Sequence, residues 1–314
     1  MLVYDNLSDI PRDVNTVITL GTFDGVHIGH KKILDRVKNE AAKTGGRSFL
    51  ITFDPHPKNV VGDRDGIKIL TTTREKKEIL EKYGLDNVFI IKFTKEFSQL
   101  TSEEFFKKYI IDGIGIKEIV IGYDHHFGRG RGGDEHTLRE MGKEYGFEVS
   151  ALDEVKSEES GITVSSTKIR RALSRGDIKL VTSLLSRYYS FGGTVVEGDK
   201  RGRLLGFPTA NIKLEDEAKL LPEMGIYAVE FFVDGKKHFG VMSIGKRPTF
   251  YDSGKITTEV FVFDFNKDIY GKFVTVNVVE RIRGEEKFSS AEGLIAQMKK
   301  DTEAGHEILG KLVN

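Results

Sequence analysis

The hydrophobic pattern of the chain changes its period near Tyr189, and this change constrains the fold more than any other feature. Before it, short apolar segments alternate with longer ones in which apolar residues recur every three or four positions. After it, apolar and polar residues alternate with a period of two, between turns such as the Asp-Gly pair at 234–235. One chain therefore carries the patterns of two architectures.

The first pattern predicts an α/β, Rossmann-like domain. Its segments are strands at 16–21, 48–53, 87–93, 118–122 and 147–152, and helices at 30–43, 74–84, 102–111 and 134–146. Strands separated by helices form a parallel sheet with helices on both faces. Such sheets bind ligands at the carboxyl ends of their strands.

The second pattern predicts an antiparallel barrel or sandwich. Helical character returns only at 290–312, so we expect one C-terminal helix. The joint lies between 180 and 190, which gives domains of 1–184 and 185–314. A chain of 314 residues is long enough for two cores.

Composition excludes several classes of protein. Lys plus Arg and Asp plus Glu are both 48, so the net charge is zero and a dedicated nucleic-acid binder is disfavoured. The chain has no Cys, which removes disulfides and Cys-ligated metal sites. We see neither a signal peptide nor an apolar run near the ~20 residues of a membrane span. We therefore expect a cytoplasmic protein with small-molecule ligands.

The segment GTFDGVHIGH at 21–30 joins the first strand to the first helix. Its glycines permit a sharp turn and a close approach of the backbone to a ligand. The start of a helix favours negative charge, and imidazoles three positions apart, His27 and His30, can donate to phosphate oxygens. The spacing favours a phosphate site. A tight turn with two solvent-facing histidines is the alternative, and a metal pair lacks a third ligand of obvious spacing.

A second anion site is indicated by VSSTKIR at 164–170. Hydroxyls at the start of a helix, followed by Lys168 and Arg170, suit a phosphate. Taken alone, residues 165–167 are more often plain N-caps.

The second half contains GDKRGRLLGFPTANI at 198–212. Three cations between glycines suit a triphosphate, although for that loop taken alone a surface hairpin with solvated charges is the better explanation. Thr209 and Asn211 follow Pro208 and face one way on a strand, where their oxygens could hold Mg²⁺. A polar, half-exposed strand face is the alternative.

Glu259 shares one face of its predicted strand with Phe261, Phe263 and Phe265, whereas Val260, Val262 and Asp264 share the other. Either face could point inward. If the Phe face is the core, Glu259 lies at the rim of an apolar interior, where desolvation raises a carboxyl pKa toward that of a general base. If it is merely the strand end, Glu259 is solvated and inert.

The segment GVMSIGKR at 240–247 comes within one residue of a P-loop. It lacks the final Ser or Thr and lies among strands, so we reject that interpretation.

Several of these motifs together resemble a known family. GTFDGVHIGH resembles the nucleotidyltransferase signature, and its long form resembles the prokaryotic bifunctional riboflavin kinase/FAD synthetases. TFDPHP at 52–57, GYDHHFGRGRGGD at 122–134 and VSSTKIR match the same family. GRLLGFPTANI, SIGKRPTF at 243–250, EVFVFDFNKDIYG at 259–271 and RIRGEEKF at 281–288 look like riboflavin kinase.

The resemblance implies an enzyme that uses riboflavin and ATP to make FMN and ADP, and then FMN and ATP to make FAD and pyrophosphate. In the nucleotidyltransferase domain it implies that ATP is bound by Gly21, Phe23, Asp24, Gly25, His27, His30, Ser165, Ser166, Thr167 and Arg170. The flavin residues there are His56, Asp124 and Phe127.

In the kinase domain the resemblance implies ATP contacts from Gly198, Lys200, Arg203, Pro208, Thr209 and Asn211. Thr209 and Asn211 hold Mg²⁺ with ATP, Glu259 is the general base, and Arg283 lies on the flavin side.

Three departures from the family pattern are visible. His125 stands where an aromatic residue is frequent, Ser243 where Asn is frequent, and Val260 where His or Tyr is frequent. A chain with one activity only, a flavin-binding regulator and a nucleic-acid-binding nucleotidyltransferase are the rival interpretations. The sequence leaves the oligomeric state open, a monomer included.

Overall fold

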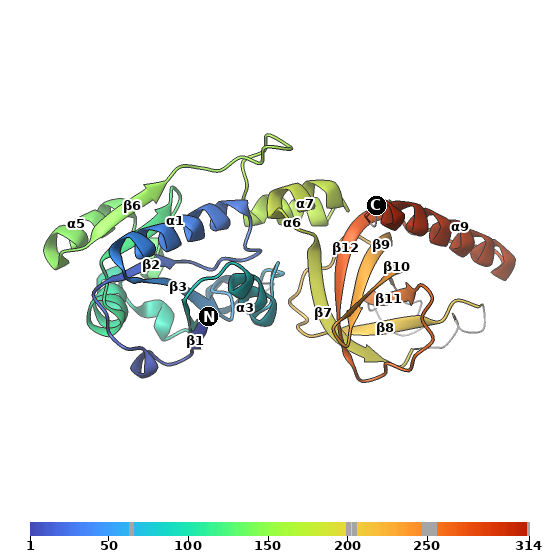
Figure 1. Ribbon diagram of the computed structural model, residues 1–314, viewed down its shortest axis with the longest axis horizontal. Helices are drawn as coiled ribbons and strands as arrows, with labels where there is room; N and C mark the ends of the chain where they lie inside the picture. The colour runs from blue at the N-terminus through green and yellow to red at the C-terminus, as the bar shows by residue number, and fades with distance from the viewer. Residues whose placement is uncertain (63–65, 199–201, 203–205, 247–255, 313–314) are drawn as a thin grey trace. The chain divides into compact units, whose positions relative to one another are not determined.

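Figure 1 shows the protein as a computed structural model, which describes residues 1–62, 66–198, 202, 206–246 and 256–312. The chain divides into two compact units, Met1–Ser166 and Thr167–Asn314. This division falls earlier than the predicted joint, because the segment after Ser166 makes more of its contacts with the second unit. The boundary at 184/185 stays a prediction.

The first unit is built on a six-stranded sheet in which every pair of strands is parallel. The strand order is β1-β4-β3-β2-β5-β6. The strands are β1 (Leu2–Tyr4), β2 (Thr16–Leu20), β3 (Arg47–Asp54), β4 (Asn87–Lys92), β5 (Glu118–Gly122) and β6 (Glu148–Leu152). The parallel sheet that the sequence predicts is confirmed, with β1 as an additional edge strand.

The chain reverses its direction of travel through the sheet between β2 and β5. From β2 it adds β3 and β4 on one side, and then crosses to add β5 and β6 on the other. A ligand crevice forms outside the carboxyl ends of the strands at such a switch point. The segment GTFDGVHIGH follows β2, and the segment GYDHHFGRGRGGD begins at the last residue of β5.

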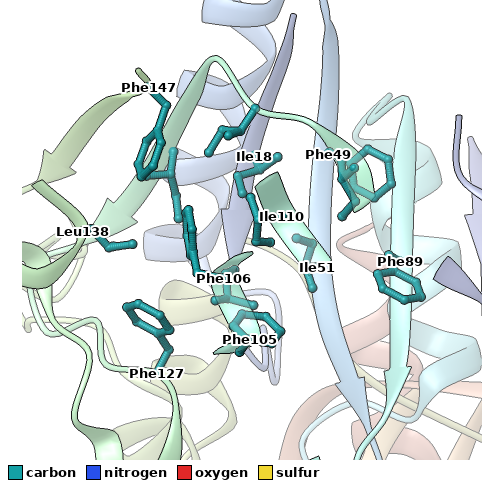
Figure 2. Packing of buried hydrophobic residues seen from close by; sticks show 14 of the residues in the cluster. Ile18, Phe49, Ile51, Phe89, Phe105, Phe106, Ile110, Phe127, Leu138 and Phe147 are labelled. Carbon is teal, nitrogen blue, oxygen red and sulfur yellow. The ribbon is translucent and has the colours of Figure 1, made fainter. Parts of the chain in front are cut away.

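Helices cover both faces of the sheet. The longer ones are α1 (Ile28–Thr44), α3 (Thr73–Lys82), the π-helix η3 (Phe106–Ile114) and α5 (Glu135–Tyr145); short turns are η1 (Leu7–Asp9), α2 (Lys58–Val61), η2 (Phe97–Gln99), α4 (Ser102–Phe105) and η4 (Arg129–Arg131). On one face Val17 of β2 packs with Val37 of α1. On the other, Ile18 packs in a cluster with Phe106 and Ile110 of η3, as Figure 2 shows.

The helix predicted over 102–111 is longer and less regular than expected. Thr101 caps it through a reciprocal capping box with Glu104, which fixes its start. It then widens into the π-helix η3 and ends at Gly115, which has a φ of 79°. The wider turn places Phe105 and Phe106 together in the core (Figure 2).

The second unit is a closed barrel in which all strand pairs are antiparallel, in the order β10-β11-β8-β7-β12-β9. The strands are β7 (Tyr189–Val196), β8 (Thr209–Leu214), β9 (Gly225–Val233), β10 (Lys236–Lys246), β11 (Ile256–Val262) and β12 (Phe273–Arg283). Asp234 and Gly235 both have positive φ, as a two-residue hairpin between β9 and β10 requires. The predicted barrel is confirmed.

Among the residues that the structure describes, three helices accompany the barrel: α6 (Ser166–Leu173), α7 (Ile178–Leu185) and α9 (Ala291–Gly310). Helix α7 packs on β7 and β12, and α9 packs on β9, β10 and β12. Gly305 of α9 lies directly on the strands, because a Cβ there would come within 2.6 Å of Val241 Cγ2 and 3.1 Å of Phe263 Cζ. The contact between α9 and the barrel therefore depends on a residue without a side chain.

We predict that Gly305→Ala destabilises the barrel unit by about 1–3 kcal/mol, because the added methyl group overpacks this contact. Gly310→Ala in the same helix is the control, since a Cβ there meets no atom within 4 Å. Urea unfolding followed by circular dichroism would measure both. An unchanged or raised midpoint for Gly305→Ala would contradict the prediction.

Candidate active sites

The segment between β2 and α1 has a backbone conformation that ordinary residues rarely adopt. Phe23, Gly25 and Val26 have φ of 47°, 87° and 38°, all in the left-handed region. Phe23 and Val26 are nevertheless almost completely buried. Strain of this kind costs about 1–3 kcal/mol a residue and persists only where the surroundings fix the backbone.

The buried carboxylate of Asp24 provides that anchor. It accepts hydrogen bonds from the backbone N–H of Leu70 at 2.9 Å and of Thr71 at 3.0 Å. The hydroxyl of Thr71 in turn accepts from the N–H of Gly25 at 3.0 Å. A Cβ on Gly25 would lie 2.8 Å from Leu70 Cδ1, so glycine is required there. Asp24 therefore builds the loop, and its predicted contact with ATP stays a prediction.

The two histidines meet at the start of α1. His27 is the N-cap, and its Nδ1 accepts a hydrogen bond from the backbone N–H of His30 at 3.3 Å. The imidazole rings are stacked with centroids 3.6 Å apart, and the ring of Phe23 stacks on His30 at 4.5 Å. Because Nδ1 of His27 accepts, the neutral ring carries its proton on Nε2, where it can be donated to an anion.

The predicted second anion segment lies against this loop. Ser166 Oγ donates a hydrogen bond to the carbonyl oxygen of Asp24 at 2.9 Å. A Cβ on Gly29 would lie 3.1 Å from Val164 Cγ1, so glycine permits this approach. Ser165 is half-buried between these contacts.

The other predicted ATP residues of the first domain are Gly21, Thr167 and Arg170. Gly21 directly follows β2, and a Cβ on it would lie 3.3 Å from the ring of Phe23. Thr167 and Arg170 lie on α6, in the second unit, where Thr167 is exposed and Arg170 half-buried. Their contacts with ATP stay predictions.

The predicted flavin residues of the first unit differ in surroundings. Phe127 is buried in the core and packs against Phe105 and Phe106, so it shapes the loop after β5 from inside. Asp124 is exposed in the same loop. His56, after β3, accepts through Nδ1 from the N–H of Lys58 at 3.2 Å. Their flavin contacts stay predictions.

Sequence reasoning missed one residue of this unit, Lys76 of α3. Its side chain is buried, and Nζ donates to the carbonyl oxygen of Thr22 at 2.7 Å and to Thr52 Oγ1 at 3.1 Å. Burial lowers the pKa of Lys76 to about 8, although the charges of Asp24 and Asp54 act in the opposite direction. A lysine in an amphipathic helix ordinarily indicates a solvated face, so the sequence held no signal for it.

The predicted kinase residues come together on two neighbouring strands. Glu259 of β11 is paired in register with Asn211 of β8, and Phe261 with Thr209. Thr209 Oγ1 donates to Glu259 Oε2 at 2.8 Å. Val260 and Ile212 point into the barrel, so this cluster lies on its outer surface. The Val face of β11 is therefore the interior, and Glu259 is not at the rim of the barrel core.

Glycine permits close packing beside this cluster. A Cβ on Gly198 would lie 2.3–2.6 Å from the side-chain atoms of Asn211. Pro208 is exposed immediately before β8. Lys200 and Arg203, the predicted cations of the loop, lie outside the described residues. The segment at 240–246 belongs to β10, which supports the rejection of a P-loop there.

A row of aromatic rings continues from the polar cluster along the outer face. The ring centroids of Phe207 and Phe261 are 5.2 Å apart, and those of Phe261 and Phe263 are 5.9 Å apart. The ring of Phe263 stacks on that of His306 of α9, with centroids 3.9 Å apart. Sequence reasoning identified the shared face but not its cover, which is α9.

Arg283 joins β12 to α9. Its guanidinium donates to both carboxylate oxygens of Asp301, at 2.8 and 2.7 Å, and Gln297 Nε2 donates to the same carboxylate at 2.9 Å. The hydrogen bonds to Asp301 raise the pKa of Arg283. Arg283 thus fixes the C-terminal helix, and its predicted contact with flavin stays a prediction.

Metal-ligand clusters of a transition-metal kind do not form in the part of the chain that the structure describes, where no three His, Cys, Asp or Glu side chains gather. Oxygen donors from Thr209 and Asn211 are the kind that Mg²⁺ accepts, and phosphates and water would complete the coordination. The donor set therefore fits Mg²⁺ bound together with a nucleotide.

Each of the two units matches the model of a known protein family. A family model described as FAD synthetase matches residues 9–168, and one described as riboflavin kinase matches residues 185–309. The two models follow one another in the order that the motifs indicate.

Relatives with this arrangement span nearly the whole chain. The bifunctional riboflavin kinase/FMN adenylyltransferase of Listeria monocytogenes is 38% identical over 301 residues, which cover 96% of this chain and 94% of that protein. The protein of the same description from Bacillus subtilis is 36% identical over 294 residues, with coverage of 92% and 91%.

A solved structure shares the fold of both units. It is named as a macrolide-efflux protein from Streptococcus pneumoniae, with a TM-score of 0.85, 33% sequence identity and coverage of 96% of each chain. The term efflux comes from the name of that protein and is said of that protein alone. In the present chain, none of the helices within the described ranges has the length and apolar character needed to cross a membrane.

A testable consequence concerns His125, in the loop after β5. Burial lowers its pKa to about 4, with His126 and Arg131 acting in the same direction. An unfolded histidine titrates near 6.5, so between about pH 6.5 and 4 the unfolded chain binds a proton that the folded chain does not. Stability therefore falls as the pH falls through this window.

We expect His125→Phe to reduce the loss of stability between pH 7.5 and pH 5 by about 1–2 kcal/mol. The measurement is the urea midpoint of the first unit at both pH values. His136→Gln serves as the control, because His136 is exposed on α5. Equal pH dependence in wild type and His125→Phe would show that His125 is not the group responsible.

Proposed function

Because this chain belongs to the bifunctional riboflavin kinase/FMN adenylyltransferase family, we propose residue roles for the two reactions of that family. The barrel phosphorylates riboflavin to FMN, and the parallel-sheet unit adenylylates FMN to FAD with release of pyrophosphate. Since both family models match, a chain with one activity alone and a catalytically silent flavin-binding regulator are disfavoured.

For adenylyl transfer, the stacked pair of His27 and His30 at the start of α1 is the observation that supports the proposal. A phosphate oxygen of FMN attacks the α-phosphorus of ATP, the bond between the α-phosphorus and the bridging oxygen breaks, and pyrophosphate leaves. His27 Nε2 and the ring of His30 donate to the phosphate oxygens and offset the charge that develops on them. Ser165 and Ser166, in the same unit, contact these phosphates.

For the kinase reaction, Glu259 is the general base that accepts the proton of the riboflavin 5′-hydroxyl. The 5′-hydroxyl of riboflavin attacks the γ-phosphorus of ATP, its proton passes to Glu259, and ADP leaves. Thr209 orients the carboxylate through its 2.8 Å hydrogen bond to Oε2, which leaves Oε1 to accept the proton. Thr209 and Asn211 would hold Mg²⁺ together with ATP, and the ion would supply charge neutralisation at the phosphates.

The end of the aromatic row beside this cluster, where Phe207 and Phe261 are half-buried, gives the flavin a surface to bind. Isoalloxazine is a flat, largely apolar ring system, and aromatic side chains stack on such rings. Phe207 and Phe261 lie next to Thr209, so a ring bound there keeps its ribityl chain near Glu259. In this proposal the remaining ATP contacts of the kinase unit come from Gly198, Lys200 and Arg203. The flavin contacts of the other unit come from Asp124 and His56.

Cellular setting and partners belong to the proposal as well. Zero net charge supports small-molecule substrates without a nucleic-acid partner. We place the enzyme in the cytoplasm, where its nucleotide substrates are found.

The first experiment follows flavins by chromatography while the purified chain acts on riboflavin, ATP and Mg²⁺. We expect FMN to appear first and then to convert to FAD. FMN alone would refute adenylyl transfer, and bound flavin without any product would favour the regulator.

Two variants test the residue roles. His27→Asn keeps an N-cap acceptor but loses the imidazole, so FAD formation should fall by about 10²–10⁴-fold while FMN formation is unchanged. Glu259→Gln should lower FMN formation by about 10²–10⁴-fold, with FAD formation from supplied FMN unchanged. Each variant is the folding control of the other, and loss of both products in either one would refute the assignment.

A further inference from the structure

The ammonium group of Lys76 lies beneath the loop that carries the histidine pair. Only 7% of this residue is exposed. Its Nζ donates to the Thr22 carbonyl at 2.7 Å and to Thr52 Oγ1 at 3.1 Å. Thr52 Oγ1 donates to the same carbonyl at 3.1 Å, so two donors converge on one backbone oxygen.

That oxygen belongs to the peptide that opens the strained segment. In a trans peptide the C=O and the following N–H point in opposite directions, so a carbonyl held toward Lys76 directs the N–H of Phe23 away from it. Phe23 has a φ of 47°, and its ring stacks on His30. The hydrogen bonds to Thr22 therefore set the direction of the peptide and of the ring that packs against His30.

Burying a cation costs free energy, and here the buried cation of Lys76 holds one backbone carbonyl. Burial of a charged group is unfavourable unless hydrogen bonds and an opposite charge compensate it. The opposite charges that act on Lys76 are the carboxylates of Asp24, from the loop after β2, and Asp54, from the end of β3. A neutral, apolar side chain at this position would fill the space without that cost, so the charge itself needs an explanation.

We propose that protonated Lys76 is a positioning residue for adenylyl transfer. Its ammonium group holds the Thr22–Phe23 peptide in the orientation that places Phe23 and His30, and it adds positive charge beneath the loop that receives the ATP phosphates. This inference rests on the proposed site at His27 and His30. The residue acts through the loop and does not touch the reacting atoms.

Lys76→Met tests the proposal in the full-length chain, with Lys82→Met as the matched control, because Lys82 is exposed on the same helix. We expect Lys76→Met to lower kcat for FAD formation by about 10²-fold, with a smaller change in KM for ATP. FMN formation should be unchanged, because the barrel carries it. Urea unfolding shows how much of each variant is folded.

The pH profile separates positioning by a charge from simple packing. Wild-type FAD formation should fall as the pH rises through about 8, where Lys76 loses its proton, and FMN formation should not show this step. Lys76→Met, which has no proton to lose, should show no such step. A merely structural role would change the amount of folded enzyme without removing a pH transition.

Thr52→Val supplies a second test that does not depend on the folding of Lys76→Met. Valine keeps the shape of threonine but removes the hydroxyl that accepts from Lys76 Nζ. The ammonium group is then less well compensated, so the alkaline fall in FAD formation should move to lower pH. An unmoved transition would overturn the proposal.

The outcomes distinguish this inference from the function on which it rests. If the wild type makes no FAD from FMN and ATP, the adenylyl site itself is wrong. If the wild type makes FAD and Lys76→Met makes it at the same rate per folded molecule, or keeps the alkaline transition, only the role of Lys76 is overturned.

Discussion

The hydrogen bonds between the carboxylate of Asp24 and the backbone at Leu70 and Thr71 determine the geometry of the first active site. They hold a segment in which two non-glycine residues have positive φ, and that segment delivers His27 to the N-cap of α1. The carbonyl oxygen of the same residue accepts a hydrogen bond from Ser166, which brings the predicted second anion-binding segment to the loop. A single buried acid thus joins three segments distant in sequence. It can be buried because its oxygens are satisfied by hydrogen bonds.

The barrel positions its chemical groups by a different device. Strand register alone places Glu259 opposite Asn211, and the two-residue period puts Thr209 on the same outer face. These side chains lie on regular strands, and the backbone hydrogen bonds between the strands hold them in position. The helix α9 then covers the neighbouring aromatic row, with Gly305 permitting the approach and the pair of Arg283 and Asp301 fixing the helix end.

Much of this architecture could be predicted from the sequence, because its signals are local. The change of hydrophobic period separates a parallel sheet from a barrel, and the histidine motif falls on the strand-to-helix junction. The inward face of β11 could not be predicted, since Val260 and Phe261 are both apolar and the answer depends on the helix that covers the outer face. The flavin roles predicted for Phe127 and Arg283 rest on the family motifs alone. In the structure Phe127 packs in the core, and Arg283 forms an ion pair with Asp301.

Asp24 also creates an electrostatic difficulty for the site that it builds. A carboxylate placed beneath a phosphate-binding loop repels the phosphates, and the low local dielectric strengthens that repulsion. Lys76 is buried as well, and its charge interacts favourably with that of Asp24. Together the acid supplies hydrogen-bond acceptors to the backbone and the lysine offsets its charge, so the loop can be rigid without being negative. This arrangement accounts for a buried lysine beneath the loop at which we propose that the ATP phosphates bind.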